Sequence, residues 1–390
     1  MQLSKRITGL TGGGSDGWDV YYRAKQMHRD GKDITHLTIG EHDIGTDRSI
    51  LDAMHAAALA GHTGYAMFNG NTNLRERVAA RVTERTGVRT TPDNVLITPG
   101  GQSGLFATHS ATCDEGDKAL FIDPFYATYP GTIRGVGAAP VAIQARADRL
   151  FQPDPADIAA RADGAKSLLV NSPNNPTGVI YSRETMEGIA RVCRDHALWL
   201  ISDEVYDTQV WHGEHLSPRM LPGIEAQTLV IGSLSKSHAM TGSRLGWVIG
   251  PEEAIAHIGN LATHTTYGVP GFIQEAACFA LDQGPAFEAA VAAPFRRRRD
   301  LVLQLVEGQN TVRAIPAEGA MYVMLDIRAT GLSGEAFANR LLDAHHVAVM
   351  PGESFGTAAA GHVRVALTVA DDRLAEAVGH ILSLAASLAG

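Results

Sequence analysis

A lysine in a serine-rich turn is the residue of this sequence that is best suited to covalent chemistry. Ser233-Leu234-Ser235-Lys236 follows the apolar run Thr228 to Ile231, and Arg244 comes shortly after the lysine. A lysine at a strand end, beside small hydroxyl residues and a second cation, can have a lowered pKa and attack a carbonyl to form a Schiff base. Arg244 adds a fork of N–H donors that suits a phosphate. The segment therefore indicates carbonyl chemistry beside an anion site.

Three further loops carry polar groups of complementary kinds, each directly after an apolar run. The glycines of Pro99-Gly100-Gly101-Gln102-Ser103 favour a strand-to-helix turn whose N–H groups meet a phosphate, although a plain tight turn explains them equally well. Asn175 stands in a Pro-flanked turn, which either aims its amide at a ligand oxygen or is purely structural. Asp203, with Tyr206 three residues later, places a carboxylate where it can stabilise a buried cation such as a protonated pyridine nitrogen; a helix cap or an exposed ion pair is the alternative.

The elements that must position these loops repeat a simple rhythm between about residues 95 and 250. Short apolar runs alternate with longer amphipathic stretches such as Glu184 to His196, which is typical of a mostly parallel sheet covered on both faces. Ligands on such sheets gather beyond the carboxyl ends of the strands, where the four loops fall. The predicted strands are Val95 to Ile97, Ala119 to Ile122, Ser167 to Val170, Leu198 to Ile201 and Thr228 to Ile231.

The C-terminal part has a different pattern and predicts a second, smaller domain. A long helix is expected over Phe295 to Glu307, followed by strands at Met321 to Asp326 and His362 to Thr368. The last of these alternates apolar with polar or small residues, which favours a half-solvated antiparallel strand. The boundaries that we predict are 50–284 for the large domain, with 1–49 and 285–390 forming an N-terminal arm and the small domain.

Taken together, these motifs closely resemble those of the class I/II pyridoxal-phosphate aminotransferases, from about residue 35 to the C-terminus. The quartet is Pro99-Gly100-Gly101-Gln102, Asn175-Pro176-Thr177-Gly178, Asp203-Glu204-Val205-Tyr206 and Ser233-Leu234-Ser235-Lys236 with Arg244. The resemblance implies an α/β protein of fold type I. Its large domain would hold a mostly parallel seven-stranded sheet, its smaller domain would also be α/β, and a homodimer would share its active sites at the subunit interface.

The same resemblance implies roles for the residues around the cofactor, pyridoxal 5′-phosphate. Lys236 would hold it as a covalent Schiff base and carry the proton between the substrate Cα and the cofactor. Asp203 would pair with the pyridinium nitrogen, and Tyr206 and Asn175 would bind the phenolic oxygen. Tyr126, in Asp123-Pro124-Phe125-Tyr126, matches the aromatic residue that stacks on the ring.

Phosphate and substrate contacts follow from the family pattern in the same way. The backbone of Gly101 and Gln102, together with Ser233 and Arg244, would hold the phosphate, and Tyr65 would reach the phosphate site of the neighbouring subunit. Arg364 would fork the substrate α-carboxylate, with Asn175 and Gly40 against it. Two departures stand out: Ser243 replaces a bulky aromatic before Arg244, and Glu41-His42-Asp43 lacks the usual proline before the aspartate.

The predicted reaction is a ping-pong transfer of the amino group of an L-amino acid to a 2-oxo acid such as pyruvate or 2-oxoglutarate. Segments 234–251, 295–302 and 325–343 look similar to bacterial arginine–pyruvate transaminases. A basic donor needs carboxylates for its guanidinium, and Glu41 and Asp43 are candidates. Aspartate, alanine and aromatic donors stay open. A β-eliminating lyase on the same fold is the nearest rival; a cofactor-sensing regulator is disfavoured because only about 35 residues precede the first family-like segment, too few for a DNA-binding module.

Composition excludes several other classes of function. The 390 residues carry 33 Lys+Arg against 42 Asp+Glu, a net charge of −9, which argues against binding nucleic acid. No apolar stretch reaches the ~18 residues of a membrane helix or has the pattern of a signal peptide. The three scattered cysteines favour buried thiols in a reducing compartment, so a cytoplasmic protein is expected.

Three local patterns are expected to mislead. Gly12, Gly14 and Gly17 satisfy GxGxxG, but no credible strand precedes them, so a mobile arm is favoured over a nucleotide site. His212 and His215 form an HxxH that we assign to a surface loop, and we expect no metal site. Arg296 to Arg299 are expected on a solvated or interface face of a helix.

Overall fold

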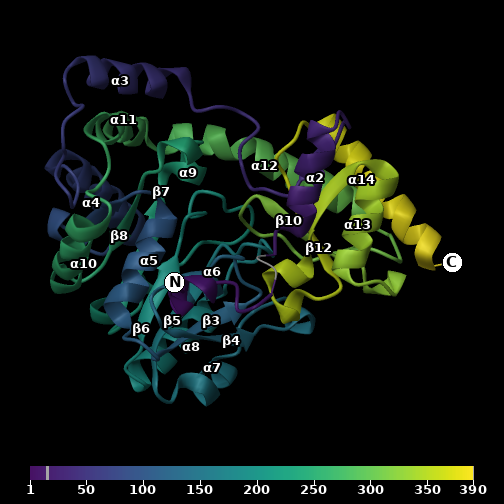
Figure 1. Ribbon diagram of the computed structural model, residues 1–390, viewed down its shortest axis with the longest axis horizontal. Coiled ribbons are helices and arrows are strands. Elements are labelled where there is room, and N and C mark those ends of the chain that lie inside the picture. The colour runs from purple at the N-terminus through teal and green to yellow at the C-terminus, as the bar shows by residue number, and fades with distance from the viewer. Residues whose placement is uncertain (15–16, 390) are drawn as a thin grey trace.

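Two β-sheets organise the chain, which a computed structural model describes over residues 1–14 and 17–389 (Figure 1). The larger sheet has seven strands in the order β2-β8-β7-β6-β5-β3-β4. Neighbouring strands are parallel except for β8, which runs against both β2 and β7. Its strands are β2 (Val95–Thr98), β3 (Lys118–Asp123), β4 (Ala139–Gln144), β5 (Ala165–Asn171), β6 (Trp199–Asp203), β7 (Thr228–Ser233) and β8 (Gly246–Ile249). The seven-stranded, mostly parallel sheet is confirmed.

Helices cover both faces of this sheet because its central strands are apolar on both sides. On β5, Leu168 and Val170 pack into one core while Leu169 packs into another. One face carries α5, α6 and α10, and the other carries α7 and α8 beside α4 and α11. These helices are α4 (Thr72–Thr86), α5 (Gly101–Thr112), α6 (Tyr129–Gly135), α7 (Pro155–Ala162), α8 (Arg183–Asp195), α10 (Glu252–Thr265) and α11 (Gly271–Asp282); α3 (Arg48–Leu59) packs on α11.

The register of the sheet brings the ends of three strands together. Asn171 at the end of β5 lies opposite Asp203 at the end of β6, and Asp203 lies opposite Ile231 of β7. Two residues beyond Ile231, Ser233 ends β7 and leads into the short helix α9 (Leu234–Ser237). The carboxyl ends of neighbouring strands therefore deliver three of the chemically interesting loops to one edge of the sheet.

The second sheet has five strands in the order β1-β11-β12-β10-β9. It joins the N-terminal β1 (Thr35–Leu37) to β9 (Arg313–Ala314), β10 (Tyr322–Asp326), β11 (Val347–Pro351) and β12 (His362–Ala366). β12 is antiparallel to both of its neighbours, as expected, but all five of its residues are buried, so the expectation of a half-solvated strand is wrong. Its polar positions point into protein, because β12 is the central strand of the sheet.

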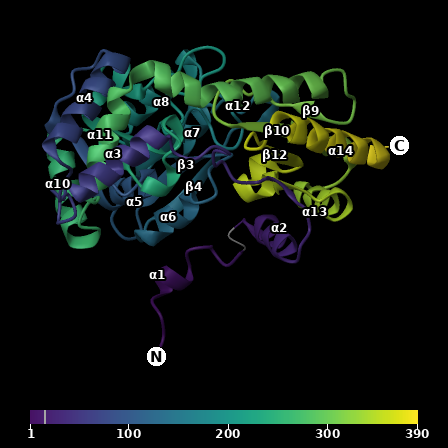
Figure 2. The same cartoon turned by 90° about the horizontal axis from the view of Figure 1, so that it is seen from above.

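A long helix connects the two sheets. α12 (Gly284–Val306) runs from the large sheet to the small one in both views (Figures 1 and 2). The small sheet is covered by α2 (Asp19–Arg29), α13 (Gly334–His345) and α14 (Asp371–Ala389), with α2 packed beside α13. The short α1 (Lys5–Thr8) lies at the periphery (Figure 2). None of the described helices is long and apolar enough to cross a membrane.

Sequence and structure differ at element limits and in strands that were not predicted. α12 begins well before the expected Phe295, although it contains Pro294, and the strands β1, β4, β8, β9 and β11 escaped prediction. β4 is an edge strand with a mixed burial pattern, and β8 is only four residues long. The division into domains at residues 49/50 and 284/285 stays a prediction.

Candidate active site

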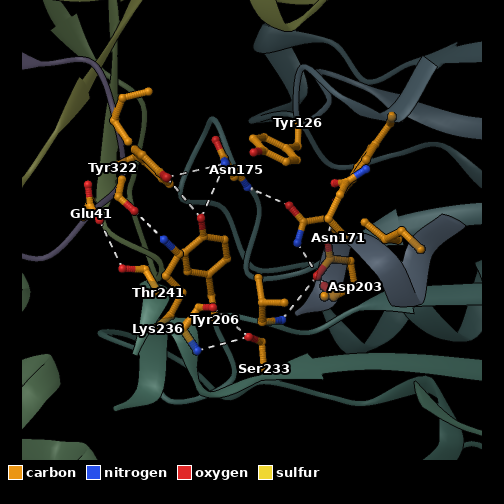
Figure 3. Close-up of a pocket in the computed structure, with 18 of the residues that line it drawn as sticks. Glu41, Tyr126, Asn171, Asn175, Asp203, Tyr206, Ser233, Lys236, Thr241 and Tyr322 are labelled. Atoms are coloured by element: carbon orange, nitrogen blue, oxygen red, sulfur yellow. Dashed lines mark hydrogen bonds between the residues drawn. The ribbon is translucent and has the colours of Figure 1, made fainter. Parts of the chain in front are cut away.

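A cavity of about 300 Å³ lies beyond the carboxyl ends of β5, β6 and β7, where the loop after β1 and the strands β10 and β12 face the large sheet (Figure 3). It collects nearly all of the residues that the sequence nominated. The lining residues are Trp18, Ile39, Gly40, Glu41, Gly101, Gln102, Leu105, Tyr126, Tyr129, Asn171, Asn175, Asp203, Val205, Tyr206, Ser233, Ser235, Lys236, Thr241, Arg244, Tyr322 and Arg364.

Lys236 projects into this cavity from α9. The hydroxyl of Ser233 accepts a hydrogen bond from the Ser235 backbone N–H at 3.0 Å and so caps the short helix that carries the lysine. The Lys236 ammonium donates to the backbone oxygen of Gly40, which belongs to the loop after β1. Burial lowers the pKa of Lys236 to about 8. The charge of Glu41 opposes this shift, whereas the cations Arg364 and Arg244 add to it. A substantial fraction of this amine is therefore neutral near pH 8, as a nucleophile or proton carrier must be.

Asp203 presents a buried carboxylate to the same cavity, with 4% of its surface exposed. The hydroxyl of Tyr129 donates to its Oδ2 at 2.7 Å, and the Val205 backbone N–H donates to Oδ1 at 3.3 Å. Burial raises the pKa of Asp203 to about 6, although both hydrogen bonds oppose that shift. A carboxylate in this position gains stability when a cation is placed against it, because the cation offsets the cost of burying the charge.

Asn175 connects Tyr206, which follows the large sheet's β6, to Tyr322 and Arg364 of the small sheet. Its Nδ2 donates to the hydroxyls of Tyr206 at 3.4 Å and Tyr322 at 3.5 Å, and its Oδ1 accepts from Arg364 Nη1 at 2.7 Å. The backbone N–H of Asn175 donates to Oδ1 of Asn171, which fixes the turn onto the end of β5 (Figure 3). The turn that carries Asn175 therefore fixes the orientation of its side-chain amide.

Arg364 is held in place on the central strand β12 with 1% of its surface exposed. Its guanidinium carbon lies 4.3 Å from the ring centroids of both Tyr322 and Phe355, so the cation is sandwiched between two aromatic faces. It also donates to the backbone oxygen of Thr38, and its Nε, buried, has no hydrogen-bond partner. A preorganised guanidinium of this kind suits a planar carboxylate.

Gly40 must be a glycine where it lies. A Cβ at this position would come within 1.7 Å of the Tyr322 hydroxyl, which belongs to the group of side chains around Arg364. The close approach lets the Gly40 backbone oxygen meet Lys236 while Tyr322 stays over Arg364. Any side chain here would push the two walls of the cavity apart.

A cradle for an anion occurs where α5 begins. Gly100 caps this helix with φ +80° and no side-chain cap, which leaves the first N–H groups of the helix from Gly101 onward facing the cavity. A Cβ on Gly100 would lie 2.3 Å from Nη2 of Arg244, so the guanidinium rests against the glycine backbone. The hydroxyls of Ser233 and Ser235 line the same cavity. Helix N-terminus, guanidinium and hydroxyls together form a donor set that suits a phosphate.

Two expected site residues behave differently from the rest. Tyr65 is 89% exposed and does not line the cavity; its ring lies 5.7 Å from that of Tyr267. Gln102 lines the cavity, but its side-chain amide is engaged with Thr128 and Thr132. Only its backbone is thereby left for a ligand, and the phosphate contact of that backbone stays a prediction.

Several cavity residues escaped the sequence analysis. Tyr129 follows Tyr126 by three residues and begins α6, and the two rings meet edge to face at 5.8 Å, so the closeness of the two tyrosines in the sequence was an available signal. Tyr322 begins β10 after the segment Gly319-Ala320-Met321, which the alternation of a strand alone does not single out. Trp18 precedes α2 in the N-terminal segment, and nothing local in the sequence connects it to the cavity.

The patterns expected to mislead have instructive outcomes. Gly12 and Gly14 follow a short helix and a turn, not a strand, and positions 15 and 16 of that motif lie outside the described residues. His212 is exposed as expected, but the surface assignment of His215 is wrong: its side chain is 11% exposed and pairs with Glu204 at 3.0 Å. Within residues 1–14 and 17–389 no group of three or more His, Cys, Asp or Glu is placed to hold a metal ion, and the three cysteines are buried and free.

The four arginines also depart from expectation. Arg296 and Arg297 are exposed, but Arg298 is buried inside the chain, so the expectation of a solvated or interface face is wrong for Arg298. It forms a fork with Asp43, which therefore faces Arg298 and is not a lining residue of the cavity. Of the two carboxylates considered for a guanidinium, Glu41 alone lines the cavity.

A doubly covered, mostly parallel sheet with a lysine, a buried carboxylate and an anion cradle at its strand ends defines a fold type I enzyme that uses pyridoxal phosphate. Residues 32–381 match the family model for aminotransferase class I and II. The chain belongs to this family and is a pyridoxal-phosphate-dependent transaminase that acts on amino acids and 2-oxo acids.

Individual relatives agree with this assignment. The chain is 40% identical to the arginine–pyruvate transaminase AruH of Pseudomonas aeruginosa, covering 100% of each chain. It is 35% identical to the aspartate/prephenate aminotransferase of Thermus thermophilus, covering 92% of this chain and 93% of that protein. Among solved structures, Thermus thermophilus aspartate aminotransferase with maleate superposes with a TM-score of 0.92 at 33% identity, covering 98% of this chain and 100% of the other.

The residues present fit this cofactor. The anion cradle at α5 suits its phosphate, the raised pKa of Asp203 calls for a cation such as its pyridinium nitrogen, and Lys236 is a half-buried amine with a lowered pKa. When bound, pyridoxal phosphate supplies an electron sink for the carbanion formed at the substrate Cα. The protein supplies the orientation, the ionisation states and a proton carrier.

Proposed function

We propose that this transaminase takes a basic L-amino acid, arginine in the first instance, as its amino donor and passes the amino group to pyruvate or 2-oxoglutarate by a ping-pong cycle. The observation that carries the proposal is the charge inventory of the cavity. The acidic residues lining it are Glu41 and Asp203, and this proposal assigns Asp203 to the pyridinium nitrogen. Glu41, exposed to the cavity and hydrogen-bonded to Thr241 at 3.1 Å, is left for a guanidinium.

The cationic inventory points the same way. The Lys and Arg residues that line the cavity from the described part of this chain are Lys236, Arg244 and Arg364. Each has a role in this proposal: Lys236 on the cofactor aldehyde, Arg244 on its phosphate and Arg364 on the substrate α-carboxylate. The described part of this chain therefore places no fourth cation in the cavity for the second carboxylate of an acidic donor. The 40% identity to an arginine–pyruvate transaminase over the whole chain adds support.

The remaining site roles belong to the same proposal. Asp203 pairs with the pyridinium nitrogen, and Tyr206 and Asn175 bind the phenolic oxygen. Tyr126 stacks on the ring, and Gly101, Gln102 and Ser233 complete the phosphate contacts. Lys236 moves the proton between the substrate Cα and the cofactor, which its lowered pKa favours. Gly40 lies beside the α-carboxylate that Arg364 binds.

The proposed assembly is a cytoplasmic homodimer in which Tyr65 reaches the phosphate site of the neighbouring subunit. Support comes from a cluster of exposed apolar side chains around this residue: Tyr65 is 89% exposed, Met67 61% and Tyr267 54%. Such a cluster on a monomer is typical of a protein interface. The cytoplasmic assignment is supported by three buried free cysteines, which suit a reducing compartment.

An amino-donor panel against pyruvate and 2-oxoglutarate tests the substrate. We expect arginine to give the highest kcat/KM, and Glu41→Gln to raise the KM for arginine about tenfold while leaving that for alanine within twofold, because alanine has no guanidinium to lose. Equal effects on both donors would remove Glu41 from substrate recognition. A higher kcat/KM for aspartate than for arginine would overturn the basic donor.

The lyase alternative is separated by the product of one half-reaction. With an amino acid alone, a transaminase accumulates pyridoxamine phosphate, whereas a β-eliminating lyase releases pyruvate and ammonia from a sulfur amino acid and leaves no pyridoxamine form. We expect the pyridoxamine absorbance. Borohydride trapping should place the cofactor on the peptide that contains Lys236.

A further inference from the structure

The run Arg296–Arg299 has no role in the function described so far. These residues follow one another on α12, so each is turned by ~100° from the last and they point in different directions. Arg296 donates to the Trp211 backbone oxygen at 2.9 Å, and Arg299 to that of Ala317 at 2.8 Å. Arg297 is exposed and binds Asp371, whereas Arg298 is buried with 5% exposure.

Arg298 gathers three separate parts of the chain. Its Nη1 and Nη2 fork onto the two carboxylate oxygens of Asp43 at 2.9 and 2.6 Å. The same Nη1 donates to the backbone oxygen of Leu367 at 3.1 Å, and Nε donates to Asp371 at 3.0 Å. One side chain on the helix that connects the two sheets therefore holds the loop after β1, the end of β12 and the start of α14.

Two of these segments carry the residues proposed to meet the substrate. Asp43 follows Gly40 and Glu41 in the same loop, and Leu367 lies three residues beyond Arg364. Arg298 does not line the cavity, so it reaches the substrate only through what it positions. It joins the loop that presents Glu41 to the strand that presents Arg364.

The loop is tied to the end of β12 by further contacts that Arg298 completes. Thr368 Oγ1 donates to the backbone oxygen of Ile39 at 3.2 Å. His42 packs edge to face on Phe295 of α12, with ring centroids 5.0 Å apart, three residues from Arg298. Burial, and then the charge of Lys236, lower the pKa of His42 to about 4, so this imidazole is neutral and packs as an apolar group. The Glu41-His42-Asp43 departure from the family pattern thus docks on α12.

We propose that Arg298 is a positioning residue for the substrate, which sets the separation between the Arg364 guanidinium and the Gly40–Glu41 loop. The part that concerns Glu41 rests on the proposed basic donor, while the part that concerns Arg364 and Gly40 applies to any amino acid substrate.

The geometry requires an arginine. Its planar fork satisfies both oxygens of Asp43 while Nε, pointing away, satisfies Asp371. A lysine keeps the charge but offers one ammonium, which cannot face Asp43, Leu367 and Asp371 with the same spacing. Replacing Arg298 by lysine should therefore loosen the loop without removing a buried cation from its two carboxylates.

The test compares Arg298→Lys, Asp43→Asn and their double variant with Arg297→Lys in the holoenzyme. Arg297 is the matched control because it neighbours Arg298 and binds Asp371 but does not touch the loop. Binding is measured with 2-methylalanine, which has the α-carboxylate but no α-proton and so changes the cofactor absorbance without turnover. The half-reactions with L-alanine and L-arginine give the maximal rates.

We expect Arg298→Lys and Asp43→Asn each to weaken 2-methylalanine binding about tenfold and to change the maximal rate with alanine by less than about threefold. The double variant should bind 2-methylalanine no more weakly than the single variants, because each single substitution already removes the same link between Arg298 and Asp43. Arg297→Lys should stay within twofold. If Arg298→Lys does not fold, Asp43→Asn, on an exposed loop, carries the test alone.

Unchanged binding in both variants, with only a lower melting temperature, would reduce Arg298 to a structural residue and overturn the proposal. An equal loss in Arg297→Lys would do the same. Failure of the basic-donor proposal is distinguishable, since it shows in Glu41→Gln with arginine and leaves the effect of Arg298→Lys on 2-methylalanine unaltered.

Discussion

The two sides of the cavity are built in different ways. The cofactor side consists of Gly101, Asn171, Asp203, Ser233 and Lys236, all at the ends of strands of one sheet or in the segments that follow those ends. The substrate side consists of Ile39, Gly40, Glu41, Tyr322 and Arg364, which come from opposite ends of the chain. The first is fixed by backbone ladders, and the second by side-chain hydrogen bonds to Asn175, Arg298 and the Thr38 backbone.

This difference teaches where function can be adjusted. A backbone ladder between adjacent strands places its end residues with little dependence on side-chain identity. Side-chain links can be altered one residue at a time, so the substrate side can change specificity while the cofactor side keeps its chemistry. We expect substitutions on the cofactor side to act mainly on kcat, and those on the substrate side mainly on KM.

The largest effect should come from Lys236→Ala. Removing the amine takes away both the covalent anchor and the proton carrier, and we expect the rate to fall by at least about 10⁴-fold. Borohydride treatment of the variant with pyridoxal phosphate should label no peptide. Residual turnover within a hundredfold of the wild type would show that another group moves the proton.

Asp203→Asn should follow, with a loss of about 10²- to 10³-fold in kcat, because the ring nitrogen loses the charge that keeps it protonated. The same substitution should not lower the folding stability of the cofactor-free protein, in contrast to its effect on kcat. Burial raises the pKa of Asp203 to about 6, so above that pH the ionised carboxylate costs the cofactor-free protein folding free energy. Urea unfolding at pH 8 should therefore find the cofactor-free variant no less stable than the wild type. A less stable variant would mean that the Tyr129 hydrogen bond outweighs the desolvation.

The same contrast explains what the sequence could predict. Lys236, Asp203 and Asn175 were identifiable because each stands in a local motif after an apolar run, and the topology of a parallel sheet brings such ends together. The mostly parallel order of this sheet was predictable for the same reason, whereas its count of seven strands was implied only by the family resemblance. Its antiparallel member, β8, is four residues long and gives too short a pattern to distinguish from a turn.

The substrate side resists prediction because its contacts are not local. The fork between Arg298 and Asp43 joins residues 255 positions apart, and nothing in the Arg296–Arg299 run distinguishes the buried arginine from its neighbours. Asp43 therefore seemed as available to a guanidinium as Glu41. His215 was misassigned for a similar reason: its partner Glu204 lies on the segment after β6 and does not line the cavity, and only the folded chain brings the two together.

Tyr129→Phe tests whether the cofactor side depends on side chains at all. The change removes the 2.7 Å hydrogen bond to Asp203 and keeps the ring, so we expect kcat at pH 7 to fall by about tenfold, the loss of one hydrogen bond to a charged group. Since this hydrogen bond lowers the pKa of Asp203, its removal should raise that pKa, and the deficit should grow as the pH falls. A deficit that is equal at pH 6 and pH 9 would assign Tyr129 a packing role only.

The smallest effect should be a pH shift in Glu41→Gln, and it tests whether the two sides are electrically independent. Lys236 captures pyridoxal phosphate as the neutral amine, so the capture rate of the cofactor-free protein should rise with pH through about 8 and then level off. The carboxylate of Glu41 raises the pKa of Lys236 against the lowering effect of burial, so neutralising Glu41 should move the midpoint to lower pH.

Thr241→Val is the control, since it removes the hydroxyl that binds Glu41 but keeps the charge, and its midpoint should not move. Stopped-flow absorbance gives the midpoint of each of the three proteins. A shift confined to Glu41→Gln means that the residue proposed to select the substrate also sets the ionisation of the catalytic lysine. Donor specificity and cofactor chemistry then cannot be changed separately at this position. Identical midpoints in all three proteins would instead show that the two sides of the cavity are electrically independent.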